Sequence, residues 1–402
     1  MPGSFRPSLP ATLFTLVTLA GLNPAGAQSA ADRADRMVRS LIHTGSGVDT
    51  AARFTVDQEM ARLHVTGASV AVVAGGKVVW ARGFGAKEAG TAAKVDSTTL
   101  FLAGSISKSV FATAVMSLVD RGTLPLDSNV NALLTSWRLP ESRFTEKEKV
   151  TLRRILSHQA GLTVWGFPGY DADKPVPTVP QLLDGASPAN TPAVRNDTIP
   201  GARWLYSGGG YTVAQLAATD VTGEPFPALM KRLVLAPTGM SRSTYENPLP
   251  ASRVGEAASG HEKPDTAVHG KWHVYPEMAA AGLWTTASDL ARWGIAVMRS
   301  YRGERDALLS AAVAREMLRP QTALPRTGPG AAQSGVWWGL GVQLAGSARS
   351  FNFSHGGRDE GFVASVVFYP ELDVGLVVLT NSTNGAFLGE VGTAFNKAFV
   401  LR

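Results

Sequence analysis

Runs of β-forming residues lie near both ends of this 402-residue chain, and this distribution limits the folds it can adopt. ASVAVVA (68–74) and KVVWARGFG (77–85) are joined by two glycines, which is a strong hairpin signal. Near the other end, strands are predicted over 337–345, 362–370 and 373–381. Segments from both ends must therefore meet in one antiparallel sheet.

The middle of the chain, from roughly 125 to 335, has helical periodicity instead, as in VTLRRILSH (150–158) and ASDLARWGIAVMR (287–299). Amphipathic helices are also predicted over 31–42 and from about Phe387 to Val400. Residues 165–201 interrupt the middle with seven prolines and no periodicity, and so long an irregular segment is usually functional or disordered.

These patterns predict an α/β (α+β) fold, with an antiparallel sheet built from both chain ends, flanking helices and a large, mostly helical inserted domain. We assign 28–125 and 335–402 to the sheet-containing lobe and 126–334 to the helical lobe. A cleft where two lobes meet is the usual place for a small-molecule site.

The first 27 residues are typical of a secretory signal peptide, because a short apolar run ends in the small-residue triplet Ala25-Gly26-Ala27. The run is shorter than a membrane-spanning helix needs, so no stable membrane anchor is expected. The chain has no cysteine, which excludes disulfides and a lipid-bearing N-terminal cysteine. We therefore expect a periplasmic or secreted protein.

Composition excludes other classes of protein. With 45% apolar and 17% charged residues the chain is typical of a globular protein. Its formal net charge of +6 is scattered rather than gathered into a basic run, so no nucleic-acid partner is expected.

One stretch, LAGSISKSVFATAVMSLVDRG (102–122), places a lysine at the start of an apolar helix. Ser105 and Lys108 are three residues apart, which puts both on one helix face within hydrogen-bonding reach. A desolvated lysine has a lowered pKa and can accept the serine proton. The alternative is that Ser105 is an N-cap and Lys108 a surface residue of the first turn.

Two further motifs favour chemistry. RWLYSGGGYTVAQLA (203–217) carries Tyr206 in a glycine-rich turn before a helix, although Tyr206 could instead be a packed turn aromatic. HGGRDEGF (355–362) lies just before a predicted strand. With S-x-x-K, these motifs resemble those of penicillin-recognising serine enzymes.

The chain from about Ala68 to Phe399 therefore resembles the serine β-lactamase-related family. The branch it resembles holds class C β-lactamases, D-alanyl-D-alanine carboxypeptidases, D-aminopeptidases and family VIII esterases. Three further landmarks follow the family's order, namely LSHQAGL (156–162), LAPTGM (235–240) and GLWTTASDLARW (282–293).

The resemblance implies Ser105 as the nucleophile, Lys108 as its proton acceptor and Tyr206 as a second acid/base that serves the leaving group. His355, Gly356 and Gly357 take the place of the family's K-T-G triad and would bind substrate. Arg358 would follow on the same strand. The backbone N–H groups of Ser105 and Arg358 would then hold the oxyanion, where each donor is typically worth about 3–4 kcal/mol.

The sequence departs from the family pattern twice. Gly208 stands where the second motif, Y-x-N, has asparagine, so an amide that would contact a substrate amide is missing. His355 stands where K-T-G has lysine, and a histidine is charged only part of the time near neutral pH. Both departures leave the nucleophile in place and bear on substrate choice.

Other candidates have simpler explanations. His158 is expected to be a buried histidine at a helix end rather than a base, and Trp337-Trp338 to be strand core. His269 and His273 have metal-ligand spacing but no evident third ligand, so surface placement is favoured. No G-x-S-x-G is present, which argues against an α/β-hydrolase.

The sequence thus predicts an exported serine hydrolase that cleaves an amide or ester through an acyl-enzyme, without a metal or cofactor. Its partner would be a small acyl substrate, either an ester, a β-lactam or a D-amino-acid peptide. The alternative is a non-catalytic envelope protein that keeps the fold as a binding module.

Overall fold

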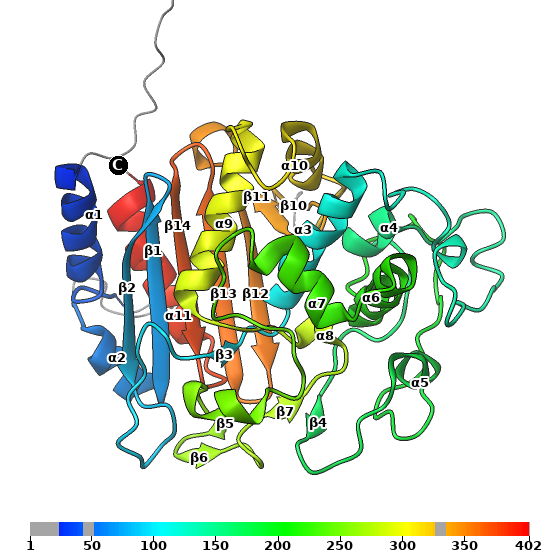
Figure 1. Ribbon diagram of the computed structural model, residues 1–402. Helices are drawn as coiled ribbons and strands as arrows, with labels where there is room; N and C mark the ends of the chain where they lie inside the picture. The colour runs from blue at the N-terminus through cyan, green and yellow to red at the C-terminus, as the bar shows by residue number, and fades with distance from the viewer. Residues whose placement is uncertain (1–23, 43–51, 326–334, 402) are drawn as a thin grey trace, which may run out of the picture.

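The computed structural model describes residues 24–42, 52–325 and 335–401. Within them, eight strands form one antiparallel sheet in the order β2-β1-β14-β13-β12-β11-β10-β9 (Figure 1). The strands are β1 (Gly67–Ala74), β2 (Lys77–Gly85), β9 (Thr322–Ala323), β10 (Val336–Trp338), β11 (Gln343–Ala345), β12 (Asn352–Asp359), β13 (Phe362–Tyr369) and β14 (Val374–Thr380). Since β1 lies beside β14, the sheet is built from both chain ends, as the sequence predicts.

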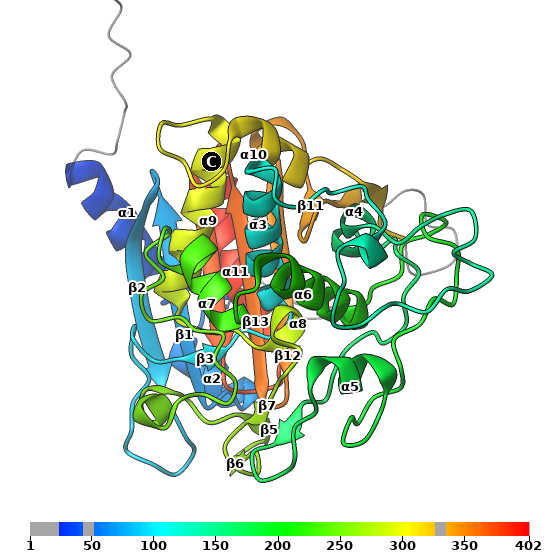
Figure 2. The ribbon, with the colours of Figure 1, turned by 45° about the vertical axis from the view of Figure 1, so that its right-hand side comes forward.

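Helices cover both faces of the sheet, which explains why every residue of β1 is buried. On one face, α1 (Pro24–Met37), α2 (Val56–Leu63) and α11 (Ala386–Phe395) pack against alternate residues of β1 and β14. On the other face lie α9 (Ala287–Arg302) and α3 (Ile106–Asp120), as Figure 2 shows. The result is a layer of sheet between two layers of helix.

A group of shorter helices and loops continues from α3 away from the sheet (Figure 2). Its helices are α4 (Leu152–Leu156), α5 (Val179–Asp184), α6 (Gly208–Thr222), α7 (Phe226–Met230), α8 (Met278–Ala281) and α10 (Ala311–Met317). Short 3₁₀ helices occur at η1 (Val130–Ala132), η3 (Ala251–Glu256) and η4 (Ala348–Ser350), and π-helical turns at η2 (Lys231–Leu235) and η5 (Asn396–Val400). Both α3 and α6 contact α8, so these three helices gather at the end of α3 that carries the serine motif.

Three two-stranded sheets connect loops near the start of α3. They are β3 (Phe101–Leu102) with β8 (Trp284–Thr285), β4 (Tyr170–Asp171) with β7 (His273–Val274), and β5 (His261–Lys263) with β6 (Thr266–Ala267). The β3–β8 pair leads directly into α3 and therefore fixes where that helix begins.

Some sequence predictions need correction. The segment 337–345 is a hairpin rather than one strand, because the chain turns at Gly341, whose φ is +84°, between β10 and β11. The helix predicted over 31–42 ends at Met37, and Leu41 instead forms a bridge with Phe54. The hairpin at 68–85 is confirmed, and the C-terminal helix is formed by α11 and η5.

The predicted signal peptide, residues 1–27, falls mostly outside the described residues, so its cleavage stays a prediction. None of the helices in the part of the chain that the structure describes is long and apolar enough to span a membrane. The division into lobes also stays a prediction, although α9, which lies within 126–334, packs directly on the sheet.

Candidate active site

Ser105 lies at the first turn of α3, between the short strand β3 and the helix. Gly104 before it has a φ of +53°, and a Cβ there would lie 2.4 Å from the backbone nitrogen of Arg358. Only glycine therefore lets the chain turn into α3 this close to β12. The Ser105 side chain makes no capping hydrogen bond to the helix, so its hydroxyl is left for other contacts.

Lys108 is buried beneath Ser105, with only 2% of its surface exposed. Its Nζ donates to Ser105 Oγ at 2.9 Å and to the Ala280 carbonyl at 2.8 Å. Burial lowers the pKa of Lys108 to about 7, against the opposing effect of Asp359 and Glu277. The interpretation of Lys108 as a surface residue is thus wrong, and a lysine that is partly neutral at pH 7 can accept a serine proton.

Tyr206 lies beside this pair, on the turn that precedes α6. Lys108 Nζ lies 5.1 Å from the centre of the Tyr206 ring. Burial raises the pKa of Tyr206, and a hydrogen bond with Ser105 acts in the opposite direction. The phenol therefore keeps its proton near neutral pH and is available as a donor.

His158 supports Tyr206 from behind. It is buried at the end of α4, its ring centre lies 4.1 Å from that of Tyr206, and its Nδ1 accepts a hydrogen bond from the Ser207 N–H. Burial holds the pKa of His158 well below its ordinary value. The prediction that this histidine is buried at a helix end is confirmed.

His355 lies on β12, where it is buried against Trp338 at a ring-centre distance of 5.3 Å. Burial, together with the nearby Lys108, lowers the pKa of His355 to about 4. The expectation that His355 carries a partial charge near neutral pH is therefore wrong. A neutral imidazole at this position offers no cation to a substrate carboxylate.

The glycines after His355 bring β12 against the start of α3. A Cβ at Gly357 would lie 1.9 Å from the Ala103 carbonyl oxygen and 3.3 Å from the Ser105 nitrogen. With the Gly104 contact, this places the backbones of Ser105 and Arg358 side by side. The Arg358 side chain is exposed and donates to the Thr383 carbonyl at 2.9 Å.

Two buried carboxyl groups near Lys108 were not found by the sequence analysis. Asp359 ends β12 and Glu277 precedes α8, and burial raises the pKa of each to about 8. Asp359 Oδ2 and both carboxylate oxygens of Glu277 have no hydrogen-bond partner. Asp359 could have been suspected because it directly follows the HGGR motif, whereas nothing in the sequence marks Glu277.

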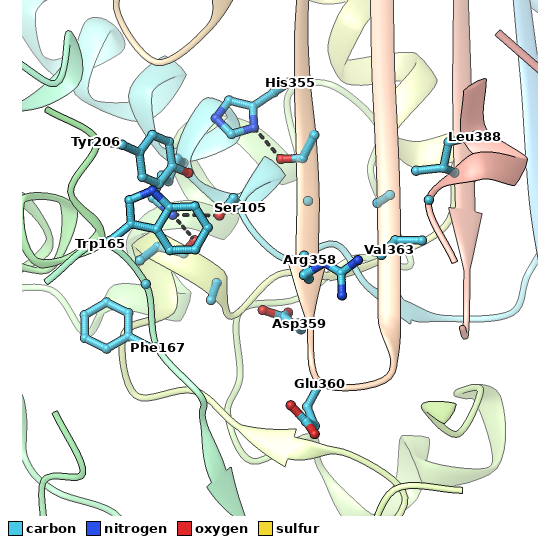
Figure 3. A pocket seen from close by; sticks show the side chains of 18 of the residues that line it. Ser105, Trp165, Phe167, Tyr206, His355, Arg358, Asp359, Glu360, Val363 and Leu388 are labelled. Atoms are coloured by element: carbon cyan, nitrogen blue, oxygen red, sulfur yellow. Dashed lines mark hydrogen bonds between the residues drawn. The ribbon is translucent and has the colours of Figure 1, made fainter. Parts of the chain in front are cut away.

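A cavity of about 590 Å³ opens above these groups (Figure 3). Ser105, Lys108 and Tyr206 line it together with His355 and the two glycines and arginine that follow. All the site residues implied by the resemblance thus face one cavity. Trp338, which is buried as predicted, also lines it, and its indole N–H donates to the Leu156 carbonyl at 3.1 Å.

His269 and His273, which have metal-ligand spacing in the sequence, contact two different carboxylates. His269 lies 3.7 Å from Asp173, and His273 lies 3.1 Å from the different carboxylate of Asp171. Among the described residues, no three histidine, aspartate or glutamate side chains gather in a way that could hold a metal ion.

Comparison with known proteins places the chain in a family. A family model described as Beta-lactamase matches residues 53–398, and the chain belongs to this family. It is a family of hydrolases, and relatives of this chain are named as an esterase, a hydrolase and penicillin-binding proteins.

Three curated relatives are similar to this chain in sequence. Esterase EstB of Burkholderia gladioli is 31% identical over 46% of this chain and 48% of its own length. Penicillin-binding protein 4 of Amycolatopsis lactamdurans is 26% identical over 57% and 58%, respectively. Unguisins hydrolase ungD of Aspergillus violaceofuscus is 25% identical over 79% of this chain and 59% of its own. The chain thus spans between about half and three fifths of these relatives.

Solved structures share the fold. The octameric penicillin-binding protein homologue of Pyrococcus abyssi has a TM-score of 0.69 and 24% identity, over 86% of this chain and 76% of that one. The β-lactamase/D-alanine carboxypeptidase of Yersinia pestis has a TM-score of 0.68 and 18% identity, over 92% and 99%.

Proposed function

We propose that this protein is a serine hydrolase that forms an acyl-enzyme on Ser105 and prefers neutral esters to substrates carrying a carboxylate. The observation that carries the proposal is the 2.9 Å contact between Ser105 Oγ and the Nζ of a buried lysine with a lowered pKa. A non-catalytic binding module would have no use for a desolvated lysine at this position.

The reaction follows from the positions of the three side chains. Neutral Lys108 takes the Ser105 proton as Oγ attacks the acyl carbonyl. The backbone N–H groups of Ser105 and Arg358 stabilise the oxyanion, and the C–O bond to the leaving alcohol then breaks. Tyr206 gives its proton to that alcohol and recovers one from the Lys108 ammonium. Water, activated by the same groups, releases the acid and restores Ser105.

The preference for esters is supported by the charges around the cavity. His355 is held neutral, and Gly208 offers no side-chain amide to a substrate amide. Glu262 and Glu360 both line the cavity and would repel a substrate carboxylate. Arg358 also lines it but donates to Thr383. The site thus supplies the groups that an activated ester needs and few of those that a penicillin or D-Ala-D-Ala peptide needs.

Labelling with a fluorophosphonate followed by intact-mass measurement and peptide mapping tests the nucleophile. We expect one adduct per chain, on Ser105, and loss of both adduct and turnover in Ser105→Ala. Ser109→Ala is the matched control, because Ser109 lies one turn further along the same helix and donates to the Gly341 carbonyl instead. An adduct that persists in Ser105→Ala would contradict the assignment.

The substrate preference is tested by comparing kcat/KM for p-nitrophenyl butyrate with that for nitrocefin and for a D-Ala-D-Ala peptide. We expect the ester to be preferred by tenfold or more. A wild-type preference for the carboxylate-bearing substrates, unchanged in His355→Lys, would show that the two motif departures do not set specificity.

We also propose that the protein is exported to the periplasm or medium after cleavage near Ala27, on the strength of the signal-like residues 1–27. N-terminal sequencing of the protein from its native host should find Gln28 or a close neighbour as the first residue. Full-length chain in the cytoplasm would contradict this.

A further inference from the structure

We propose that Trp165 and Phe167, which both line the cavity, form an apolar wall that binds the acyl chain of the substrate, in the space where the second motif's asparagine would lie. The inference rests on the proposed function and names its substrate class, which is esters of uncharged, medium-length aliphatic acids. Figure 3 shows Trp165 and Phe167 at the side of the cavity next to Tyr206.

The wall is bound to the start of α6 by its backbone. The Gly208 N–H donates to the Trp165 carbonyl and the Gly209 N–H to the Val164 carbonyl, each at 3.0 Å. The Ser207 hydroxyl donates to the Thr163 carbonyl at 2.8 Å. The same turn that positions Tyr206 therefore also positions the wall.

Gly208 is what makes room for this arrangement. A Cβ at position 208 would lie 3.0 Å from Cε2 of Phe167 and 3.2 Å from the Trp165 carbonyl oxygen. An asparagine there would have to displace the Phe167 ring. The missing amide of the second motif is thus replaced by aromatic surface rather than by open space.

Trp165 has the exposure expected of a binding surface. It is 71% exposed, and no other tryptophan, tyrosine or phenylalanine that the structure describes is as exposed. Its ring centre lies 5.4 Å from that of Tyr206, so it extends the aromatic surface from the reacting centre towards the cavity mouth. The place of this indole is what marks it, because it lines the cavity beside Tyr206, where a bound acyl chain would cover it.

The acidic side of the cavity limits what the wall can accept. Glu262 accepts a hydrogen bond from the Gly361 N–H. Glu262 and Glu360 both line this side of the cavity. An uncharged apolar chain therefore matches the cavity better than an acyl group that ends in a carboxylate.

The test is a series of p-nitrophenyl esters, from acetate to butyrate to hexanoate, with one constant leaving group. Each methylene buried against the wall contributes up to about fourfold in kcat/KM. We expect the hexanoate-to-acetate ratio to exceed about tenfold in wild type and to fall to within about threefold of unity in Trp165→Ala, mainly through KM. Trp165→Phe should keep most of the ratio, and Gly208→Asn should lose it.

Val221→Ala is the control, because Val221 is a 37% exposed apolar residue at the far end of α6, and it should leave the ratio unchanged. A second series of acetate esters with methyl, phenyl and naphthyl alcohols separates the acyl side from the leaving-group side. Circular dichroism checks that each variant is folded.

The outcomes are distinct. Wild type that is labelled at Ser105 but shows no chain-length dependence, or a dependence that Trp165→Ala leaves intact, would overturn the wall alone. A dependence on the alcohol but not on the acyl chain would also overturn it. Wild type that neither labels nor hydrolyses any ester would overturn the proposed function and the wall with it.

Discussion

Lys108 shares its buried surroundings with the carboxyl groups of Asp359 and Glu277, and the charge of each acid acts on the pKa of the lysine. Burial disfavours every charge here, so it lowers the pKa of the lysine and raises those of the acids. The negative charges of the acids stabilise the Lys108 ammonium and raise its pKa again. We therefore expect the pH dependence of activity to reflect all three groups rather than Lys108 alone.

The first prediction concerns this pH dependence. Because neutral Lys108 accepts the proton, kcat/KM for an ester should rise with pH and level off above about pH 7, the value to which burial lowers the Lys108 pKa. Asp359, whose pKa is raised to about 8, is only partly ionised near pH 7. Asp359→Asn therefore removes a fractional charge that favours the ammonium, and the acid limb should move to lower pH by less than about one unit. Glu277→Gln should move it in the same direction.

The control for that experiment is Glu371→Gln, which removes an exposed acid that does not line the cavity. It should leave the limb where it is. A limb that neither Asp359→Asn nor Glu277→Gln moves, or that moves to higher pH, would mean that the acids do not act on Lys108.

The residues that sequence could predict are those whose role depends on short spacing. Ser105 and Lys108 are one helical turn apart, so their contact follows from local geometry alone. Asp359 and Glu277 are ordinary acids in the sequence, and only the packing of β12 and α8 around Lys108 buries them. The charge state of His355 was mispredicted for the same reason, because its pKa depends on burial and on Lys108.

One arginine of helix α2 forms ion pairs with two buried acids, one on α2 and one on α11. Arg62 lies 2.5 Å from Glu59 of its own helix and 2.5 Å from Glu390 of α11. The two glutamate side chains are only 1% and 3% exposed. Burial and the neighbouring Glu59 raise the pKa of Glu390. Without the arginine, both acids would have to be buried uncharged or unpaired.

We therefore predict that Arg62→Met lowers the free energy of unfolding by about 1–3 kcal/mol at pH 7.5, because two buried acids lose their charged partner although the arginine itself is 42% exposed. The raised folded-state pKa of Glu390 means that this acid stabilises the fold only at low pH, and that stability is lost as pH rises from its unfolded value through its folded one. The deficit of Arg62→Met should thus shrink near pH 4.5. Urea denaturation at the two pH values measures it.

Arg82→Met is the matched control, because Arg82 pairs with Asp35 at 3.0 Å on the surface, with side-chain exposures of 51% and 31%. Such pairs are worth at most about 1 kcal/mol. Equal losses in the two variants, or a deficit in Arg62→Met that does not change with pH, would argue against a buried acid pair.

Elements were predictable where an apolar period runs without interruption. The helix over 287–302 and the strands over 67–85 and 362–380 follow their patterns closely. β12 is not visible as a period because Gly356 and Gly357 interrupt it, and the hairpin of β10 and β11 reads as a single apolar run. The glycines that hide these strands are the residues that let the backbone approach α3 or turn.

At the scale of the whole molecule, the site is assembled from three distant segments. Ser105 comes from the start of α3, Tyr206 from the turn before α6, and His355 from β12, which the C-terminal half adds to the sheet. One connected apolar cluster includes Val377 of β14 and Leu183 of α5. The sheet and the helical middle therefore share their core, even though the sequence patterns divide them.

The last prediction follows from this shared core. If the middle segment were an independent domain, it would melt separately from the sheet, as is common in chains above about 150 residues. Since α9 and α3 belong to the same apolar cluster as β13 and β14, losing the helical region would expose one face of the sheet to water.

We expect calorimetry of the full chain to show one transition whose van't Hoff and calorimetric enthalpies agree. Fluorophosphonate labelling of Ser105 should be lost over the same temperature range as the helical circular dichroism signal. Two resolved transitions, with labelling lost in the first and most helix in the second, would instead mean that the lobes unfold independently and that the site depends on their docking.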